Sequence, residues 1–382
     1  MVHAREDGAV IDRVVRHIYV HVPFCATVCP FCSFDVVERR AGQVDAYLDR
    51  LEAEAVVAAE QFDVVPTTLY LGGGTPSHLR IGELARIVDV ITRVFGRPSG
   101  ETTIEVHPLD AGEGKVAALG DLGFNRLSVG VQSFDDRVLA SLGRAHTAAA
   151  ALTAIERCLA TGATVSLDLI SAVGGQNLGS DLAAAVASGV HHMSVYTLTV
   201  EDGTPFARRG VQVPDDRAAG AIERTARVLG SAGFDRYEVS NYARPGRRST
   251  HNQAYWRNRW VLGLGPSAGG HLPPLDADRS AGAVAVRTAN APMAAWSGGA
   301  PPEAEALGPR EAAGDHVFCG LRLSDGVDLA EGSLRWGVDI GREFAAEIES
   351  LRCDGLVELD GTVLRATDAG YRVLDRVAAE FC

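Results

Sequence analysis

The sequence predicts an α/β protein in which a parallel sheet curves into a partial (β/α)6 barrel, followed by a small C-terminal α+β domain of winged-helix-like form. Three observations lead to this prediction. Short β-branched runs alternate with helical segments up to residue 241, the composition then shifts to Gly, Pro, Arg and Trp, and helices with a hairpin end the chain. Strand–helix alternation favours right-handed βαβ units and parallel strands. An open doubly wound sheet has the same rhythm and stays open as an alternative.

The alternation defines each expected element in order. The expected strands are Ile18–Val22, Thr68–Leu71, Thr103–Val106, Arg126–Val131, Val165–Leu169 and Met193–Leu198. The expected helices are Val44–Gln61, Ile81–Val94, Gly112–Leu122, Ala148–Leu159, Asp181–Ala187 and Asp216–Gly230. Each strand is followed by a helix, as a β/α barrel requires.

The chain divides into four parts by composition. We expect an N-terminal extension over residues 1–16, the barrel over 17–241, an irregular extension and linker over 242–302, and a small domain over 303–382. In the last part, an Asp360-Gly361 turn separates two short apolar runs, and a helix begins at Asp368, which predicts a hairpin beside helices. DNA binding is the obvious use of a winged helix, but the charge of the chain argues against it.

Composition excludes several classes of partner. The 382 residues hold 36 Lys+Arg and 49 Asp+Glu, a formal net charge of −13, which disfavours nucleic acid and anionic membranes. No apolar run approaches the about 20 residues of a membrane span. The N-terminal residues contain no apolar stretch typical of a secretory signal. We therefore expect a cytoplasmic protein that acts on a small molecule, without a membrane span or a nucleic-acid partner.

Cysteine spacing indicates where the chemistry lies. Three of the seven cysteines, Cys25, Cys29 and Cys32, form CxxxCxxC directly after the first strand. The remaining four are isolated, and we expect them to be buried as small apolar residues: Cys158, Cys319, Cys353 and Cys382. An odd, clustered set is not a disulfide framework and points to metal or redox chemistry.

The three clustered cysteines leave two metal centres to compare. A structural zinc ion needs a fourth ligand, and His21 lies too close along the strand to complete a tetrahedron. A [4Fe–4S] cluster held by three thiolates leaves one iron free for a substrate or cofactor, so we favour the cluster. The spacing resembles the signature of the radical S-adenosylmethionine (SAM) superfamily, where that free iron chelates the amino and carboxylate groups of SAM.

Polar residues and a glycine run follow the other expected strands. Gly72, Gly73 and Gly74 precede Thr75-Pro76 after the second strand and would let a ligand approach the backbone, although a plain βα turn has the same form. The carboxyl ends of barrel strands form the active-site face. Side chains at or after these ends are Glu105, Gln132, Asp168, Tyr196, Arg144 and His146. Each alone also suits a helix cap, a surface ion pair or a turn.

Together these stretches resemble the HemN/HemW branch of the radical SAM superfamily, in order, from Tyr19 to about Gly270. The matching runs are YVHVPFCATVCPFCSF, LGGGTPSHL, TIEVHP, NRLSVGVQSF, LGRAH, YEVSNYARPG, HNQAYW and GLGPSA. The resemblance implies a radical SAM barrel with a [4Fe–4S] cluster on the three cysteines and with one or two SAM molecules. It implies these cofactor-binding residues: Tyr19, Phe31, Gly72, Gly73, Gly74, Thr75, Glu105, Gln132, Arg144 and Asp168. Glu105 would reach the ribose or amino group of SAM, and Arg144 its carboxylate.

Details within the resemblance leave the activity between two classes. Ser33-Phe34 has the form seen in haem chaperones, and coproporphyrinogen oxidation is disfavoured because Phe34 stands at the fourth-cysteine position. The run from His251 to Trp256 has been linked with haem in HemW-like proteins, and it equally suits a structured loop with an aromatic anchor. His107-Pro108, Ser33 and the stretch 171–176 depart from the usual pattern, which suggests an altered substrate.

We therefore predict a radical SAM enzyme that forms a 5′-deoxyadenosyl radical and uses a second SAM to methylate or cyclopropanate a conjugated natural product. The alternative is a HemW-type haem chaperone, in which haem is an additional ligand. In either class, a flavodoxin or ferredoxin-type protein would supply the electron. The candidate catalytic residues are His107, His146 and Tyr196, and either imidazole, near its ordinary pKa, could accept the proton that the two-SAM reaction releases.

Overall fold

The computed structural model describes residues 12–382. Most of the expected N-terminal extension, residues 1–11, lies outside the described residues. The first strand begins at Val15, three residues earlier than the sequence predicts. The other expected barrel elements appear within a few residues of their predicted bounds.

One large sheet organises the described part of the chain, with the strand order β14-β13-β12-β11-β1-β4-β5-β6-β7-β8-β10-β9. Its central strands run parallel: β1 (Val15–Val22), β4 (Val64–Gly73), β5 (Thr102–Val106), β6 (Arg126–Gln132), β7 (Thr164–Ser171) and β8 (His192–Thr197). The register aligns Tyr19 with Tyr70, and Glu105 with Ser128, so inward-facing side chains of neighbouring strands lie level with one another.

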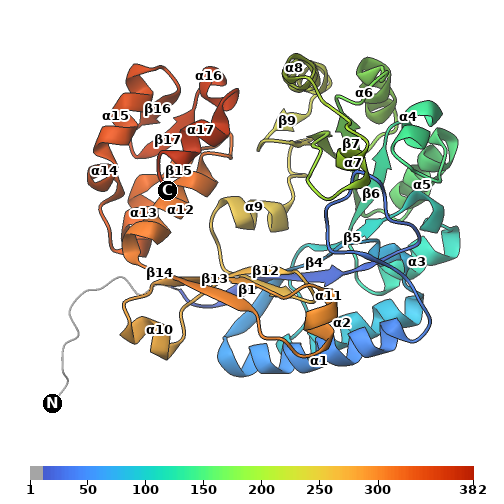
Figure 1. The fold of residues 1–382 in the computed structure, drawn as a ribbon, viewed down its shortest axis with the longest axis horizontal. Helices are drawn as coiled ribbons and strands as arrows, with labels where there is room; N and C mark the ends of the chain where they lie inside the picture. The colour runs from blue at the N-terminus through green and yellow to red at the C-terminus, as the bar shows by residue number, and fades with distance from the viewer. Residues whose placement is uncertain (1–11) are drawn as a thin grey trace.

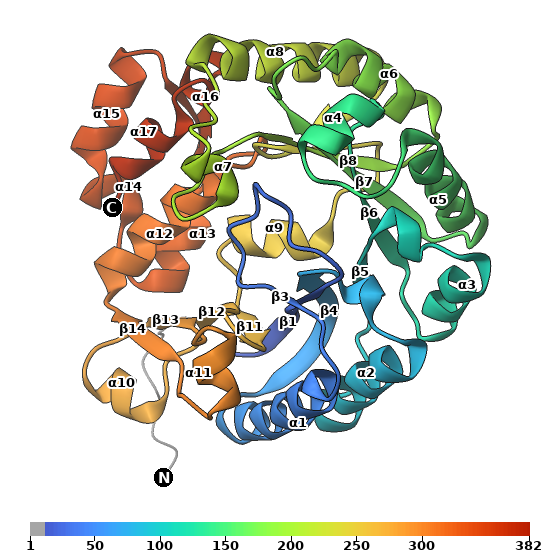
Figure 2. The same ribbon diagram turned by 45° about the vertical axis from the view of Figure 1, so that its right-hand side comes forward.

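Helices cover one face of this sheet, and the sheet curves around the other (Figures 1 and 2). The outer helices are α1 (Gln43–Gln61), α2 (Ile81–Phe95), α3 (Glu113–Asp121), α5 (Ala148–Ala160), α6 (Leu178–Ala187) and α8 (Asp215–Ser231). Buried residues of α1, such as Leu48 and Leu51, pack with the strand residues Ile18 and Val20 in one core. The partial barrel is therefore confirmed, and the doubly wound alternative, which needs helices on both faces, is not what forms.

Short elements occupy the loops at the ends of the strands. They are β2 (Phe24–Cys25), β3 (Val37–Glu38), η1 (Pro76–His78), η2 (Pro108–Asp110), α4 (Asp136–Ser141) and α7 (Pro205–Arg208). The pairing of β2 with β3 folds the cysteine loop back on itself. Within residues 12–382, no helix is long and apolar enough to cross a membrane.

The expectation of an irregular segment over 242–302 is wrong. This part contributes β10 (Asn241–Ala243), α9 (Thr250–Trp256), β11 (Val261–Leu264), β12 (Gly269–Leu272), α10 (Asp276–Ser280), β13 (Ala285–Ala289) and α11 (Met293–Ser297), and β14 (Glu303–Leu307) follows. Strand β11 runs parallel to β1 and extends the barrel wall. These strands are short, and β11 and β12 contain glycines, so their strand pattern is hard to recognise in the sequence. Gly263 is required because a Cβ there would collide with the Gly269 carbonyl.

The C-terminal part forms a small domain of helices around a three-stranded antiparallel sheet, considering the residues that the structure describes. Its elements are α12 (Pro309–Gly320), β15 (Val327–Asp328), α13 (Leu329–Trp336), α14 (Ile340–Glu343), α15 (Ala345–Cys353), β16 (Val357–Asp360), β17 (Val363–Ala366), α16 (Asp368–Tyr371) and α17 (Leu374–Ala379). The predicted hairpin and winged-helix-like fold are confirmed. Cys158 is buried as expected and Cys319 is partly buried, whereas the expectation of burial is wrong for Cys353, the last residue of α15, and for Cys382, which follows α17; both are exposed.

Candidate functional site

The three clustered cysteines lie on the loop that follows β1, at the carboxyl end of the parallel strands. Cys25 is buried, while Cys29 and Cys32 keep partial contact with solvent. Two hydrogen-bond donors point at their sulfur atoms: Thr75 Oγ1 lies 3.5 Å from Cys25 Sγ, and Arg144 Nη1 lies 3.5 Å from Cys29 Sγ. Donors of this kind stabilise negative charge on sulfur, as thiolates and iron–sulfur clusters require.

Burial raises the pKa of two thiols in this loop, those of Cys25 and Cys32. Among residues 12–382, no three His, Cys, Asp or Glu side chains are arranged to hold one metal ion. Burial raises the pKa of Cys25 to about 11, with a smaller contribution from the neighbouring thiols, while Arg144 opposes this shift. The loop by itself thus favours neutral thiols, and a bound metal centre would supply the positive charge that holds thiolates.

The glycine run lies directly beside the cysteine loop. Gly74 N–H donates to the Val22 carbonyl and Thr75 N–H to the Phe24 carbonyl, both at 2.9 Å, so the turn continues the β1 edge. Gly73 has φ +105°, and a Cβ there would meet the ring of His21 at 2.5 Å. A Cβ on Gly74 would approach the Pro23 backbone at 2.9 Å. These glycines are therefore required by close packing against the cysteine loop.

Two carboxylates face the barrel interior from β5 and β7, the strands on either side of β6. Glu105 Oε1 accepts a 2.8 Å hydrogen bond from the Tyr70 hydroxyl, and Ser128 Oγ lies 3.4 Å from Asp168 Oδ2. Burial raises the pKa of Glu105 to about 7, with a further contribution from the negative charge of Asp168. Burial likewise raises the pKa of Asp168 to about 6. Both groups retain some access to solvent, and a cationic ligand between them would restore their ionised forms.

Gln132 and Arg144 lie beside each other near Gly130 of β6, the strand between those of Glu105 and Asp168. Gln132 has φ 70° at an irregularity in the pairing of β6 with β7, a conformation that costs a non-glycine residue about 1 kcal/mol or more. Arg144 Nη2 donates to the Gly130 carbonyl at 2.8 Å, which fixes its guanidinium between the cysteine loop and β6. Strain at Gln132 beside a fixed cation indicates a binding position.

The structure brings two of the three candidate catalytic residues together. The rings of His107 and His146 meet edge to face at 5.3 Å, and His146 Nε2 lies 3.0 Å from the Val131 carbonyl. The expectation of ordinary pKa values is wrong for both, because burial lowers the pKa of His107 to about 3 and that of His146 to about 4. Tyr196 remains 46% exposed at the end of β8. Their catalytic roles stay predictions.

Phe31, an expected cofactor contact, packs against another aromatic ring, and Tyr70 is a site residue that the sequence analysis did not identify. The ring of Phe31, which lies on the cysteine loop itself, is 6.3 Å from that of Phe206 on α7, and its role as a cofactor contact stays a prediction. Tyr70 was not singled out, although it touches both Glu105 and the ring of Tyr19, 6.0 Å away. The signal was present in the sequence, because Thr68, Tyr70 and Gly72 alternate with Leu69 and Leu71 and so share the inner face of β4.

Comparisons with known proteins define the class. Residues 19–185 match the Radical SAM superfamily, and residues 307–373 match the HemN C-terminal domain. The fold is similar to the solved structure of "Coproporphyrinogen III oxidase (HemN) from Escherichia coli", with a TM-score of 0.80 and 23% identity over 97% of this chain and 90% of that chain. A radical SAM barrel with a HemN-type C-terminal domain is thus the class that the site and fold define.

Full-length relatives narrow this class further. The chain is 35% identical to "Heme chaperone HemW" of Mycobacterium tuberculosis, over 94% of this chain and 93% of the relative. It is 30% identical to the protein of the same name from Lactococcus lactis, over 95% and 96%. The chain belongs to the HemN/HemW-like family of radical SAM proteins. Membership implies a [4Fe–4S] cluster and SAM, which fits the thiols, donors and carboxylates described above.

Proposed function

We propose that this chain is a haem-binding radical SAM protein of the haem-chaperone type, with haem as its cargo. One observation carries the proposal: the relatives named "Heme chaperone HemW" match nearly the whole chain, C-terminal domain included, at 30% and 35% identity. A local feature agrees with it. Phe34, at the position of a fourth cysteine in HemN-type enzymes, is 67% exposed beside the cluster loop.

The chain's own residues divide the binding of the two cofactors. Cys25, Cys29 and Cys32 would hold the cluster, with Thr75 and Arg144 stabilising its sulfur ligands. When bound and reduced, such a cluster would supply the electron for cleavage of a C–S bond of SAM. We assign the ribose or amino group of SAM to Glu105, and the SAM carboxylate to the guanidinium of Arg144. A flavodoxin or ferredoxin-type protein is the proposed electron donor.

The two-SAM methylation or cyclopropanation predicted from the sequence ranks second. It needs a group that takes a proton from the substrate, and the low pKa values of His107 and His146 make both imidazoles weak bases at neutral pH. None of the relatives described above carries such an activity in its name. This reaction therefore stays the competing outcome of the experiment.

The experiment is an anaerobic reconstitution of the cluster followed by two assays on the same sample. Hemin titration should give a shifted Soret band that saturates at a defined ratio. Incubation with SAM and dithionite should give 5′-deoxyadenosine without S-adenosylhomocysteine. Formation of S-adenosylhomocysteine in proportion to 5′-deoxyadenosine, together with no saturable hemin binding, would replace the chaperone by the two-SAM enzyme.

A further inference from the structure

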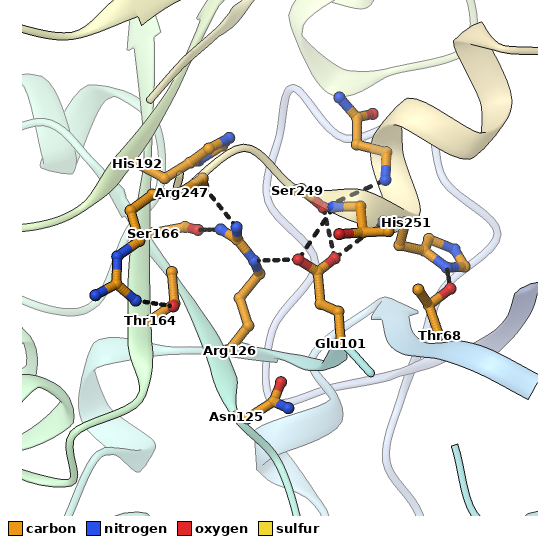
Figure 3. A network of polar contacts seen from close by, with 12 residues as sticks. Thr68, Glu101, Asn125, Arg126, Thr164, Ser166, His192, Arg247, Ser249 and His251 are labelled. Carbon is orange, nitrogen blue, oxygen red and sulfur yellow. Dashed lines mark hydrogen bonds and ion pairs between the residues drawn. The ribbon is translucent and has the colours of Figure 1, made fainter. Parts of the chain in front are cut away.

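Helix α9, which carries the run from His251 to Trp256, does not lie on the outer surface of the barrel. It crosses the space that the strands enclose, as Figure 2 shows. Glu101, just before β5, anchors its first turn: the carboxylate accepts hydrogen bonds from Ser249 Oγ, Thr250 N and His251 N at 2.8, 3.1 and 3.0 Å (Figure 3). The same carboxylate pairs with the buried Arg126 at 2.8 Å. The helix is therefore a fixed part of the barrel interior.

His251 points from α9 toward β4 and exposes only 2% of its surface. Its Nδ1 lies 2.8 Å from Thr68 Oγ1, the contact drawn in Figure 3. Its ring stacks on Tyr70 with a centroid distance of 5.2 Å and an interplanar angle of 27°. Within residues 12–382, its Nε2 has no hydrogen-bond partner. The His251 imidazole therefore does not face solvent. A large flat ligand would have to reach it from the solvent side.

Tyr70 connects this histidine with the SAM site. One side of its ring stacks against His251, and its hydroxyl donates to Glu105 Oε1 at 2.8 Å. Glu105 in turn lies against the glycine run, because a Cβ added to Gly72 would be 3.0 Å from Glu105 Oε1. His251 is thus separated from the SAM-binding carboxylate by a single side chain.

We propose that His251 is a positioning residue of the SAM site: stacked on Tyr70 and bonded to Thr68, it holds the Tyr70 hydroxyl against Glu105. The free energy of this arrangement comes from ring stacking and from a hydrogen bond to a carboxylate, which is stronger than a neutral one. The inference rests on the SAM-binding part of the proposed function and not on haem. Hemin binding by the unchanged protein tests the chaperone proposal separately.

The test compares SAM affinity in variants with reconstituted clusters of equal iron content, without reductant, by equilibrium dialysis of labelled SAM. Tyr70→Phe keeps the stacked ring and removes only the hydroxyl, and we expect about 10-fold weaker binding. His251→Ala should weaken SAM binding in the same direction. His251→Phe, which restores a flat ring, should recover part of the loss. Gln253→Ala, on the same helix, is the control and should bind SAM like the unchanged protein.

A second readout separates positioning from loss of fold. The Tyr70 hydrogen bond lowers the pKa of Glu105, against the burial and the Asp168 charge that raise it. Charged or titratable groups facing Glu105 are Asp168, Tyr19, Tyr70 and Tyr196. Removing the hydroxyl should therefore move the pH midpoint of SAM binding upward.

The outcomes decide the inference in both directions. Weaker SAM binding and a raised midpoint in Tyr70→Phe and His251→Ala support it, whether or not hemin binding changes. Affinity within twofold of the unchanged protein at every pH in both variants overturns it. If His251→Ala does not fold, His251→Phe decides in its place, because it keeps a flat ring in the core and removes only the bond to Thr68.

Discussion

We expect the substitution Glu101→Gln to break the polar contacts that hold α9 against the barrel. The Glu101 side chain is 11% exposed and its partner Arg126 is 4% exposed, so the ion pair is largely shielded from solvent. Each carboxylate oxygen accepts two donors: Oε2 takes Arg126 Nε and Thr250 N, and Oε1 takes Ser249 Oγ and His251 N. The side-chain NH2 of Gln is itself a hydrogen-bond donor. In the place of either oxygen it would face two other donors and could accept from neither. Gln therefore cannot restore the contacts, despite its equal size.

The expected cost is that of breaking a buried pair while the other charge stays buried, about 3 to 5 kcal/mol in the free energy of unfolding. Urea unfolding of the apo protein under reducing conditions measures this change. Hydrogen exchange should show in addition that the amide of Thr250 or of His251 loses protection, because the NH2 group of Gln replaces the oxygen that accepts from one of them.

The matched control is Asp325→Asn, which removes exposed pairs with Arg248 at 2.7 Å and with Arg257 at 3.3 Å. The Asp325 side chain is 43% exposed and its partners are 33% and 42% exposed, so solvent screens the attraction, and the expected cost is under about 1 kcal/mol. If Glu101→Gln costs no more than this control, or if the two amides keep their protection, then Glu101 does not anchor α9 and the reasoning fails.

Three further predictions follow from the site. Cys29→Ser should reduce the iron of the reconstituted protein from about four atoms per chain to near zero, while the exposed Cys353→Ser should not; equal iron in both would exclude the cluster assignment. Glu105→Gln should abolish SAM binding yet stabilise the apo protein above pH 7: the folded-state pKa is raised from 4.5 to about 7, so the ionised form destabilises as pH rises through that window, and an unchanged pH–stability curve would contradict this. Gln132→Gly should relieve the φ 70° strain and stabilise the apo protein by about 1 kcal/mol while weakening SAM binding; a loss of thermal stability would show that no strain is stored there.

Local patterns in the sequence predict the barrel well. The expected strand Arg126–Val131 and helix Ala148–Leu159 each extend by one residue in the structure, because uninterrupted β-branched or amphipathic runs leave little choice of secondary structure. The cysteine loop and the glycine run were equally predictable. Their chemistry depends on residues close together in the chain, and the expected βα spacing brings the two stretches side by side.

Long-range packing explains what the sequence could not show. Strands β11 to β13 are four or five residues long and hold only because neighbours pair with them, so no local periodicity announces them. The contact between Thr68 and His251 joins residues 183 positions apart. The low pKa of His107 likewise depends on burial and on the Arg144 charge, which no spacing rule reports.

The polar side chains that line the inside of the barrel indicate a ligand-binding interior. On β4, Leu69 and Leu71 are buried against the helices, while Thr68 and Tyr70 face inward toward His251 and Glu105. A closed β/α barrel fills its centre with branched apolar side chains, which gives more stability than buried polar groups do. A barrel lined instead by hydroxyls, imidazoles and carboxylates is less stable than one with an apolar centre. A bound polar ligand would offset this loss of stability. The alternation along a single strand, from Thr68 at the α9 end to Gly72 at the cysteine loop, thus marks the path along which His251 and the SAM site are connected.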